Sequence, residues 1–123
     1  MDNQTKLKQF AEHLKQADGL LITAGAGMGV DSGLPDFRGD QGFWKAYPPL
    51  KHLGKSFVDM ATPELFYTNP KLAWGFYGLR LNAYRAVEPH QGFHILKQWS
   101  DTLPSLIHGS FVFTSNVDGE FQK

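Results

Sequence analysis

The sequence contains no cysteine, which excludes disulfide bonds, thiolate catalysis and cysteine-ligated zinc within its 123 residues. It also carries no net charge, because twelve Lys and Arg side chains balance twelve Asp and Glu side chains. Such a chain has no excess of positive charge to attract nucleic acid or an anionic membrane, so we expect neither as a partner. Residues 19–30, the most apolar stretch, are too few to span a bilayer, and the start lacks a signal peptide's apolar segment. We therefore expect a soluble, cytoplasmic protein.

Hydrophobic patterning indicates two strands among several helices. Residues 20–23 and 110–114 are short, continuous apolar runs, as expected for parallel strands covered on both faces. Apolar residues recur at helical spacing over 5–17, 71–86 and 90–99. The stripes comprise Leu7, Phe10, Ala11, Leu14 and Ala17 in the first helix, Ala73, Trp74, Tyr77, Leu81 and Tyr84 in the second, and Phe93, Leu96 and Trp99 in the third. The order of these elements predicts an α/β fold with parallel strands.

Two further stretches connect these elements. Residues 35–53 are rich in glycine, proline and aromatic residues without a clear period, so we expect a long loop that is functional or mobile. Thr62, followed by Pro63 and an acidic residue, has the form of a helix start with Thr62 as the N-cap. Asn69 followed by Pro70 repeats the signal before the second long helix.

Glycines at positions 25, 27 and 29 directly follow the first predicted strand. Such glycines let backbone N–H groups approach a phosphate, and the N-terminus of a following helix adds a favourable dipole. However, the dinucleotide-binding pattern G-x-G-x-x-G fails at Val30, and the Gly-Lys-Ser/Thr of a P-loop is missing. These residues alone therefore disfavour a conventional dehydrogenase, and they leave open a glycine-rich turn that only tightens strand–helix packing.

The longer string from Gly25 to Gly39, Gly-Ala-Gly-Met-Gly-Val-Asp-Ser-Gly-Leu-Pro-Asp-Phe-Arg-Gly, resembles the first signature of the sirtuin family, GAG-I-S-x-x-S-G-I-P-D-F-R. Residues 114–119, Thr-Ser-Asn-Val-Asp-Gly, resemble the second signature, T-Q-N-x-D. Between them, residues 89–96 are similar to the family's P-N-x-x-H-x-x-L helix start. Three motifs in the family's order are a specific signal.

The resemblance implies an NAD site at the tips of the two strands. In the family, the Gly-Ala-Gly loop holds the pyrophosphate, and the Pro-Asp-Phe-Arg segment belongs to a loop that closes over NAD. Asn116 would hold the nicotinamide ribose and Asp118 the nicotinamide carboxamide, while Phe37 would shield the reactive ribose carbon from water. Asn116 and Asp118 both follow the carboxyl end of a predicted strand, where open α/β sheets bind ligands. The implied cofactor-binding residues are Gly25, Ala26, Gly27, Ser32, Asp36, Phe37, Arg38, Trp44, Ser115, Asn116, Val117 and Asp118.

The chain departs from the family pattern at several positions. Gly29 replaces a serine and Ser115 a glutamine, while Glu120 and Phe121 stand where leucine and histidine are common. The family's catalytic histidine and its Cys-x-x-Cys zinc pairs follow the second motif, so we expect both beyond Lys123. None of the five histidines present matches that general base. We therefore expect no metal site in this chain, and no activity of the chain alone.

The predicted helical insertion contains a substrate clue. Ala61, Tyr77 and Arg80 resemble the sirtuin branch that removes succinyl or malonyl groups, in which a Tyr-x-x-Arg pair binds the acyl carboxylate and a small alanine leaves room. Residues three apart share one face of a helix, and arginine offers a carboxylate a bidentate fork. The alternative is that Tyr77 packs within the helical module while Arg80 is solvated.

The combined interpretation is a partial Rossmann-like parallel sheet with a helical small-domain insertion. We assign Rossmann-like elements to about 1–37 and 89–123, a cofactor-binding loop to about 35–56, and the insertion to about 57–88. The implied activity is NAD-dependent deacylation of acylated lysine side chains in protein substrates. Two alternatives stay open: a non-catalytic module that binds NAD or ADP-ribose, and a relative that consumes NAD as an ADP-ribosyl transferase or hydrolase.

Overall fold

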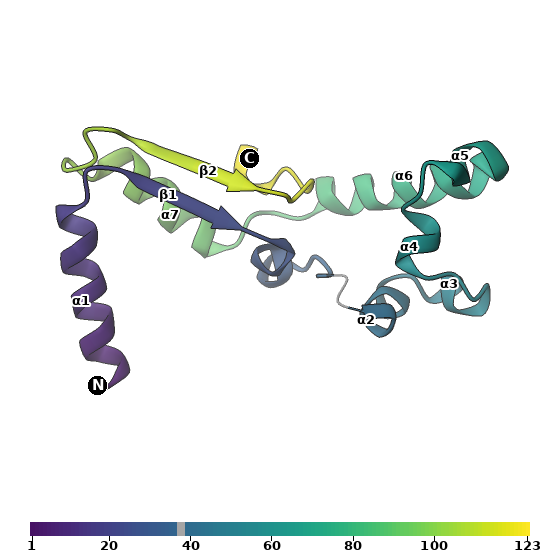
Figure 1. Ribbon diagram of the computed structural model, residues 1–123, viewed down its shortest axis with the longest axis horizontal. Coiled ribbons are helices and arrows are strands. Elements are labelled where there is room, and N and C mark those ends of the chain that lie inside the picture. Colours follow the sequence, from purple (N-terminus) through teal and green to yellow (C-terminus); the bar gives the residue numbers. More distant parts are fainter. Residues whose placement is uncertain (37–38) are drawn as a thin grey trace. The chain divides into compact units, whose positions relative to one another are not determined.

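The computed structural model describes residues 1–36 and 39–123, and it is mostly helical with one pair of strands (Figure 1). Contacts divide the chain into two compact units. The first unit consists of residues 1–24 and 91–115, and the second of residues 25–90 and 116–123. Within the part of the chain that is described, no helix has both the length and the apolar character needed to cross a bilayer.

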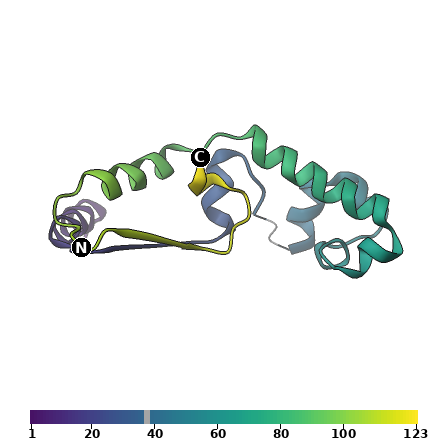
Figure 2. The same ribbon diagram turned by 90° about the horizontal axis from the view of Figure 1, so that it is seen from above.

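The first unit contains the parallel strand pair. Strands β1 (Leu20–Ala24) and β2 (Ser110–Thr114) pair in register, from Leu20 opposite Ser110 to Ala24 opposite Thr114. The two strands therefore end at the same level, and Figures 1 and 2 show them side by side and pointing the same way. Helix α1 (Asn3–Gln16) precedes β1, and helix α7 (Gln91–Thr102) precedes β2. These elements confirm the predicted α/β order.

The expectation that both strands are covered on both faces is wrong. Leu21, Phe111 and Phe113 are 66–67% exposed, and the register places Leu21 beside Phe111 on one face. The reason is that α7 lies along only one face of the pair (Figure 2). Helix α1 likewise contains no buried residue, and its predicted stripe is largely exposed at Leu7 and Phe10. The Phe10 ring contacts the half-buried Trp99 ring of α7, with centroids 5.9 Å apart.

This apolar strand face should promote self-association, because exposed strands with apolar side chains pair with other chains. We expect Phe111→Thr to raise the concentration at which the chain begins to scatter light, with the free energy of unfolding unchanged within about 0.5 kcal/mol. Threonine keeps the β-propensity of the position. The matched control is Ile107→Thr, which removes an exposed apolar side chain outside the strands. Equal scattering onsets for the two variants would contradict the prediction.

The second unit holds a helical core where a loop was expected. Residues 39–46 form α2 (Gly39–Ala46) and residues 48–52 form α3 (Pro48–His52), so the expectation of a long loop is wrong for most of that stretch. These two helices contribute Phe43 and Leu50 to the core. The other buried members of the core are Met60, Leu65, Ala73 and Phe76.

The remaining helices of this unit begin at recognisable caps. Helix α4 (Phe57–Met60) starts with a capping box in which Ser56 and Asp59 bond reciprocally. These bonds to Ser56 hold the pKa of the Asp59 carboxyl below its usual range. Helix α5 (Glu64–Thr68) follows Pro63, which takes the N-cap position predicted for Thr62. The side chain of Asn69 caps α6 (Pro70–Ala86) through the backbone N–H of Leu72, as predicted.

The buried stripe of helix α6 matches the predicted one only in part, since Ala73 is buried in both while Tyr77 and Tyr84 are half-buried. Ala73, Phe76 and Arg80 are its buried residues, whereas Trp74 is 68% exposed and Leu81 is 46% exposed. The two stripes overlap at Ala73, and the buried one faces the aromatic core built with α2 and α4. The prediction missed it because a charged residue, Arg80, occupies one of its positions.

Candidate functional site

The tips of the two strands meet directly. In the first unit, Thr114 Oγ1 donates a hydrogen bond of 2.8 Å to the carbonyl oxygen of Ala24, its partner in the last pair of the register. Directly after the end of β1, in the second unit, the Gly25 carbonyl accepts a 2.8 Å hydrogen bond from Asn116 Nδ2. The predicted convergence of the glycine loop with the Asn-Val-Asp turn is therefore confirmed. The cofactor-binding roles of these residues stay predictions.

The glycine loop folds into a 3₁₀ helix, η1 (Ala26–Ser32), instead of opening an α-helix. The Gly25 carbonyl also accepts from the backbone N–H of Met28, which closes the first turn. Because η1 is short, the α-helical dipole expected here is missing. The backbone is nevertheless accessible: Gly25 and Gly27 are exposed, and a Cβ added at either would meet no atom within 4 Å.

Ser32 ties η1 to the residues before α7. Its Oγ accepts a 3.0 Å hydrogen bond from the backbone N–H of His90, and His90 Nε2 lies 2.8 Å from the Met28 carbonyl. With the proton on Nε2, this second contact is a hydrogen bond in which the imidazole donates. Ser32 therefore supports the loop from within the protein. His90 was not among the predicted site residues, because its contact with Met28 joins positions 62 residues apart in the chain.

Asp118 and Glu120 place two carboxylates beside Gly29. Asp118 Oδ1 accepts a 3.0 Å hydrogen bond from the backbone N–H of Glu120, the first residue of the 3₁₀ helix η2 (Glu120–Gln122). A Cβ built on Gly29 would lie 3.3 Å from Glu120 Oε2 and 3.5 Å from Asp118 Oδ2, so both side chains converge on that glycine. The Glu120 side chain is 2% exposed, and neither of its oxygens has a hydrogen-bond partner among the described residues.

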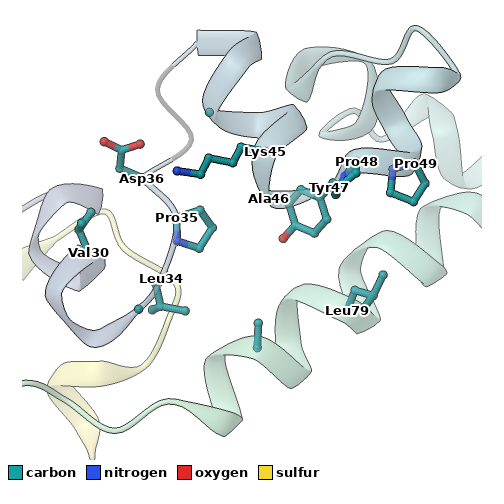
Figure 3. A pocket seen from close by; sticks show the side chains of 13 residues that line it. Val30, Leu34, Pro35, Asp36, Lys45, Ala46, Tyr47, Pro48, Pro49 and Leu79 are labelled. Atoms are coloured by element: carbon teal, nitrogen blue, oxygen red, sulfur yellow. The ribbon is translucent and has the colours of Figure 1, made fainter.

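The segment after η1 borders a cavity of about 800 Å³ in the second unit (Figure 3). Among the predicted cofactor residues that the structure describes, Asp36 alone lines it. Figure 3 shows Leu34 and Pro35 on one side, and Lys45 and Tyr47 reaching in from α2 and its end. Phe37 and Arg38, both predicted to bind the cofactor, lie outside the described residues.

Trp44 points into the helical core. Its indole N–H donates a 2.8 Å hydrogen bond to the Lys55 carbonyl, and the half-buried ring packs against the core cluster. The structure thus gives Trp44 a supporting role within the helical core. Ser115 is exposed and Val117 is 74% exposed, so both are accessible beside Asn116 in the chain.

The substrate residues predicted on α6 lie together in an aromatic cluster. The Arg80 guanidinium lies 5.7 Å from the Tyr77 ring centroid and 5.4 Å from that of Phe76. Both Nε and Nη2 of Arg80 donate to the Tyr84 hydroxyl, at 3.0 and 2.7 Å. The expectation of a solvated Arg80, the alternative to a binding role, is wrong, because the side chain is only 9% exposed. Tyr77 stacks on Phe66, and Ala61 is half-buried at the end of α4.

Tyr47 lies between this cluster and the cavity. Burial raises the pKa of its phenol, and the nearby charge of Arg80 opposes that shift in part. The hydroxyl group therefore stays protonated at neutral pH and can donate a hydrogen bond. Within the described part of the chain, no group of three or more histidine or acidic side chains is arranged to hold a metal ion.

These features define an α/β protein in which the two segments that follow a pair of parallel strands in the chain contact each other, the kind of segment to which open α/β folds bind ligands. The model of the Sir2 family matches residues 25–123, and the chain belongs to that family. The matched segment contains the glycine loop, strand β2, the cavity and the helical core.

Curated relatives agree with this assignment. The chain is 36% identical over 114 residues to an NAD-dependent protein deacylase of Candida albicans, covering 93% of this chain and 34% of that protein. It is 34% identical to an NAD-dependent protein deacetylase of Saccharolobus solfataricus, covering 94% and 42%. It is 32% identical to the mitochondrial NAD-dependent protein deacylase sirtuin-5 of Danio rerio, covering 91% and 34%. The chain thus spans between 34% and 42% of the length of these relatives.

Proposed function

We propose that this chain forms the NAD-binding portion of an NAD-dependent protein-lysine deacylase. The observation that carries the proposal is the contact between Asn116 and Gly25, which joins the two signature motifs at one point. The residues present fit the cofactor. The uncovered backbone of Gly25 and Gly27 leaves space for a pyrophosphate, and Asp118 supplies an acceptor on the other motif.

In this proposal each residue has a defined task. The backbone of the glycine loop binds the pyrophosphate, Asn116 orients the nicotinamide ribose, and Asp118 accepts a hydrogen bond from the carboxamide. Bound NAD supplies an electrophilic ribose carbon whose leaving group is nicotinamide. The hydrogen bond from Asn116 also fixes the Gly25 carbonyl, so this side chain organises the loop that it helps to form. The acyl group of a modified lysine is the second substrate.

Titration calorimetry of the 123-residue chain with NAD tests this proposal. We expect measurable binding and a loss of affinity of about tenfold in Asn116→Ala, because a buried or ligand-directed hydrogen bond is worth roughly 1–1.5 kcal/mol. Asn82→Ala, at an exposed position of α6, is the matched control and should bind like the parent chain. Absence of NAD binding by the parent chain would refute the proposal. Equal affinity for ADP-ribose and NAD would favour the alternative of a non-catalytic ADP-ribose module.

We extend the proposal to acyl groups that carry a carboxylate. Arg80 supports this extension because Tyr84 and the surrounding rings hold its guanidinium in one orientation, next to Tyr77. A preorganised guanidinium loses little entropy when it binds a carboxylate.

We therefore expect the chain to bind a succinyl-lysine peptide more tightly than the matching acetyl-lysine peptide in the presence of NAD. Arg80→Met should reduce that preference by about tenfold, since a charge-assisted pair is lost. Arg85→Met, at an exposed position in the last turn of α6, should leave the preference unchanged. Fluorescence anisotropy of labelled peptides gives both affinities. An equal preference in the parent chain and in Arg80→Met would contradict this extension.

A further inference from the structure

Glu120 is a buried acid that the proposed function does not use. Its side chain is 2% exposed, and both carboxylate oxygens lack a hydrogen-bond partner in the described part of the chain. Burying an acidic group without a donor is unfavourable, so proteins keep such groups mainly where they act on a site. The neighbouring residues show which site this is.

The Glu120 side chain lies beside the carboxylate of Asp118. Oxygens of both residues approach the same point on Gly29, at 3.3 Å for Glu120 and 3.5 Å for Asp118. A side chain at position 29 would meet both acids and Leu34 Cδ1 at 3.2 Å, so the glycine provides the space that Glu120 occupies. The arrangement brings two acidic groups together in the segment that follows β2 in the chain.

Glu120 also sets the orientation of Asp118. Its backbone N–H donates to Asp118 Oδ1, whereas Asp118 Oδ2 lies on the side of Gly29. Asp118 is half-buried and therefore remains within reach of a ligand, but Glu120 is covered. Glu120 can thus influence a ligand only through Asp118 and through the electric field of its own charge, which is weakly screened away from water.

We infer that Glu120 is a specificity-determining positioning residue, whose carboxylate makes the Asp118 site select a neutral, N–H-donating group and reject an acid. This inference rests on the proposed function. For a pyridine dinucleotide, the relevant pair is a primary amide and the corresponding carboxylate. The amide donates hydrogen bonds to carboxylates, whereas the acid would add a third negative charge beside Asp118 and Glu120.

The test compares NAD with its deamidated analogue, nicotinic acid adenine dinucleotide, by calorimetry on the 123-residue chain. We expect the parent chain to prefer NAD, and Glu120→Gln to reduce that preference by about tenfold, chiefly through tighter binding of the acid. Glu120→Asp keeps the charge and should keep the preference. Glu64→Gln removes an exposed charge from α5 in the same unit and should also keep it.

The outcomes distinguish a failure of the proposed function from a failure of this inference alone. If the parent chain binds neither dinucleotide, the proposed function fails and the inference falls with it. If NAD binds but the parent chain shows no preference, or Glu120→Gln retains it in full, the inference alone is overturned. A preference lost equally in Glu120→Gln and Glu120→Asp would show a purely structural role and overturn it as well. Thermal unfolding of each variant confirms that the compared proteins are folded.

Discussion

Replacing Phe43 with alanine should lower the free energy of unfolding of the helical unit by about 3–5 kcal/mol, the usual range for a large aromatic side chain lost from a core. Phe43 is 0% exposed and forms edge contacts with Phe57 and Phe76, with ring centroids 5.7 and 5.9 Å apart. It also contacts Tyr47, at 5.3 Å. Its removal would leave a cavity that the close-packed helices around it can close only in part.

Urea unfolding followed by circular dichroism and tryptophan fluorescence measures this loss. Tyr67→Ala is the matched control, because Tyr67 is an aromatic residue of the same unit that is 87% exposed. Its unfolding free energy should stay within about 0.5 kcal/mol of the parent value. Similar losses for the two variants would show that the core does not centre on Phe43.

Replacing Glu120 with methionine should have the opposite effect and raise the free energy of unfolding by roughly 1–3 kcal/mol. The reason is that an acid with no donor is removed from a buried position, while an unbranched side chain of similar length fills the space. The backbone N–H of residue 120 still donates to Asp118. The same urea experiment applies, with the exposed Glu64→Met as control. A lower stability of Glu120→Met would mean that the carboxylate contributes favourably to folding.

Stability and selectivity therefore oppose each other at this position. The methionine variant should be the more stable protein, yet it should discriminate less well between an amide and an acid. Such opposition is common where a binding site holds groups that folding alone would not retain. Glu120 could not be identified as part of a site from the sequence, where it was only a departure from the family pattern. Its burial and its lack of a donor among the described residues are properties of the folded chain, set by Gly29 and the other residues that surround it.

The sequence predicted local structure best where residues close together in the chain determine the secondary structure. Both strands, the Asn69 cap and the course of α6 follow from short-range signals, and the signature motifs predicted that the two strand tips meet. The exposure of the strands could not be predicted, because an apolar run has the same pattern whether one or two of its faces are covered.

The helices over residues 39–52 were missed for a different reason. Glycine and proline dominate the composition of that stretch and suggested a loop. Phe43, Tyr47 and Leu50 nevertheless recur at steps of four and three residues, which is a helical pattern that could have been recognised. The proline pair at positions 48 and 49 lies in the first turn of α3, where proline favours a helix. The role of Arg80 in the core was beyond sequence analysis, because its aromatic neighbours come from α4 as well as α6.

The division of the chain has a consequence for dissection experiments. The polypeptide passes from one unit to the other after residues 24, 90 and 115, so neither unit is a continuous stretch of sequence. A fragment of residues 25–90 would lack the Lys123 amine, which donates to the carbonyls of Tyr84 and Val87 at the end of α6. It would also lack the Asn116 amide that holds Gly25. Limited proteolysis should therefore nick this protein without releasing an autonomous piece.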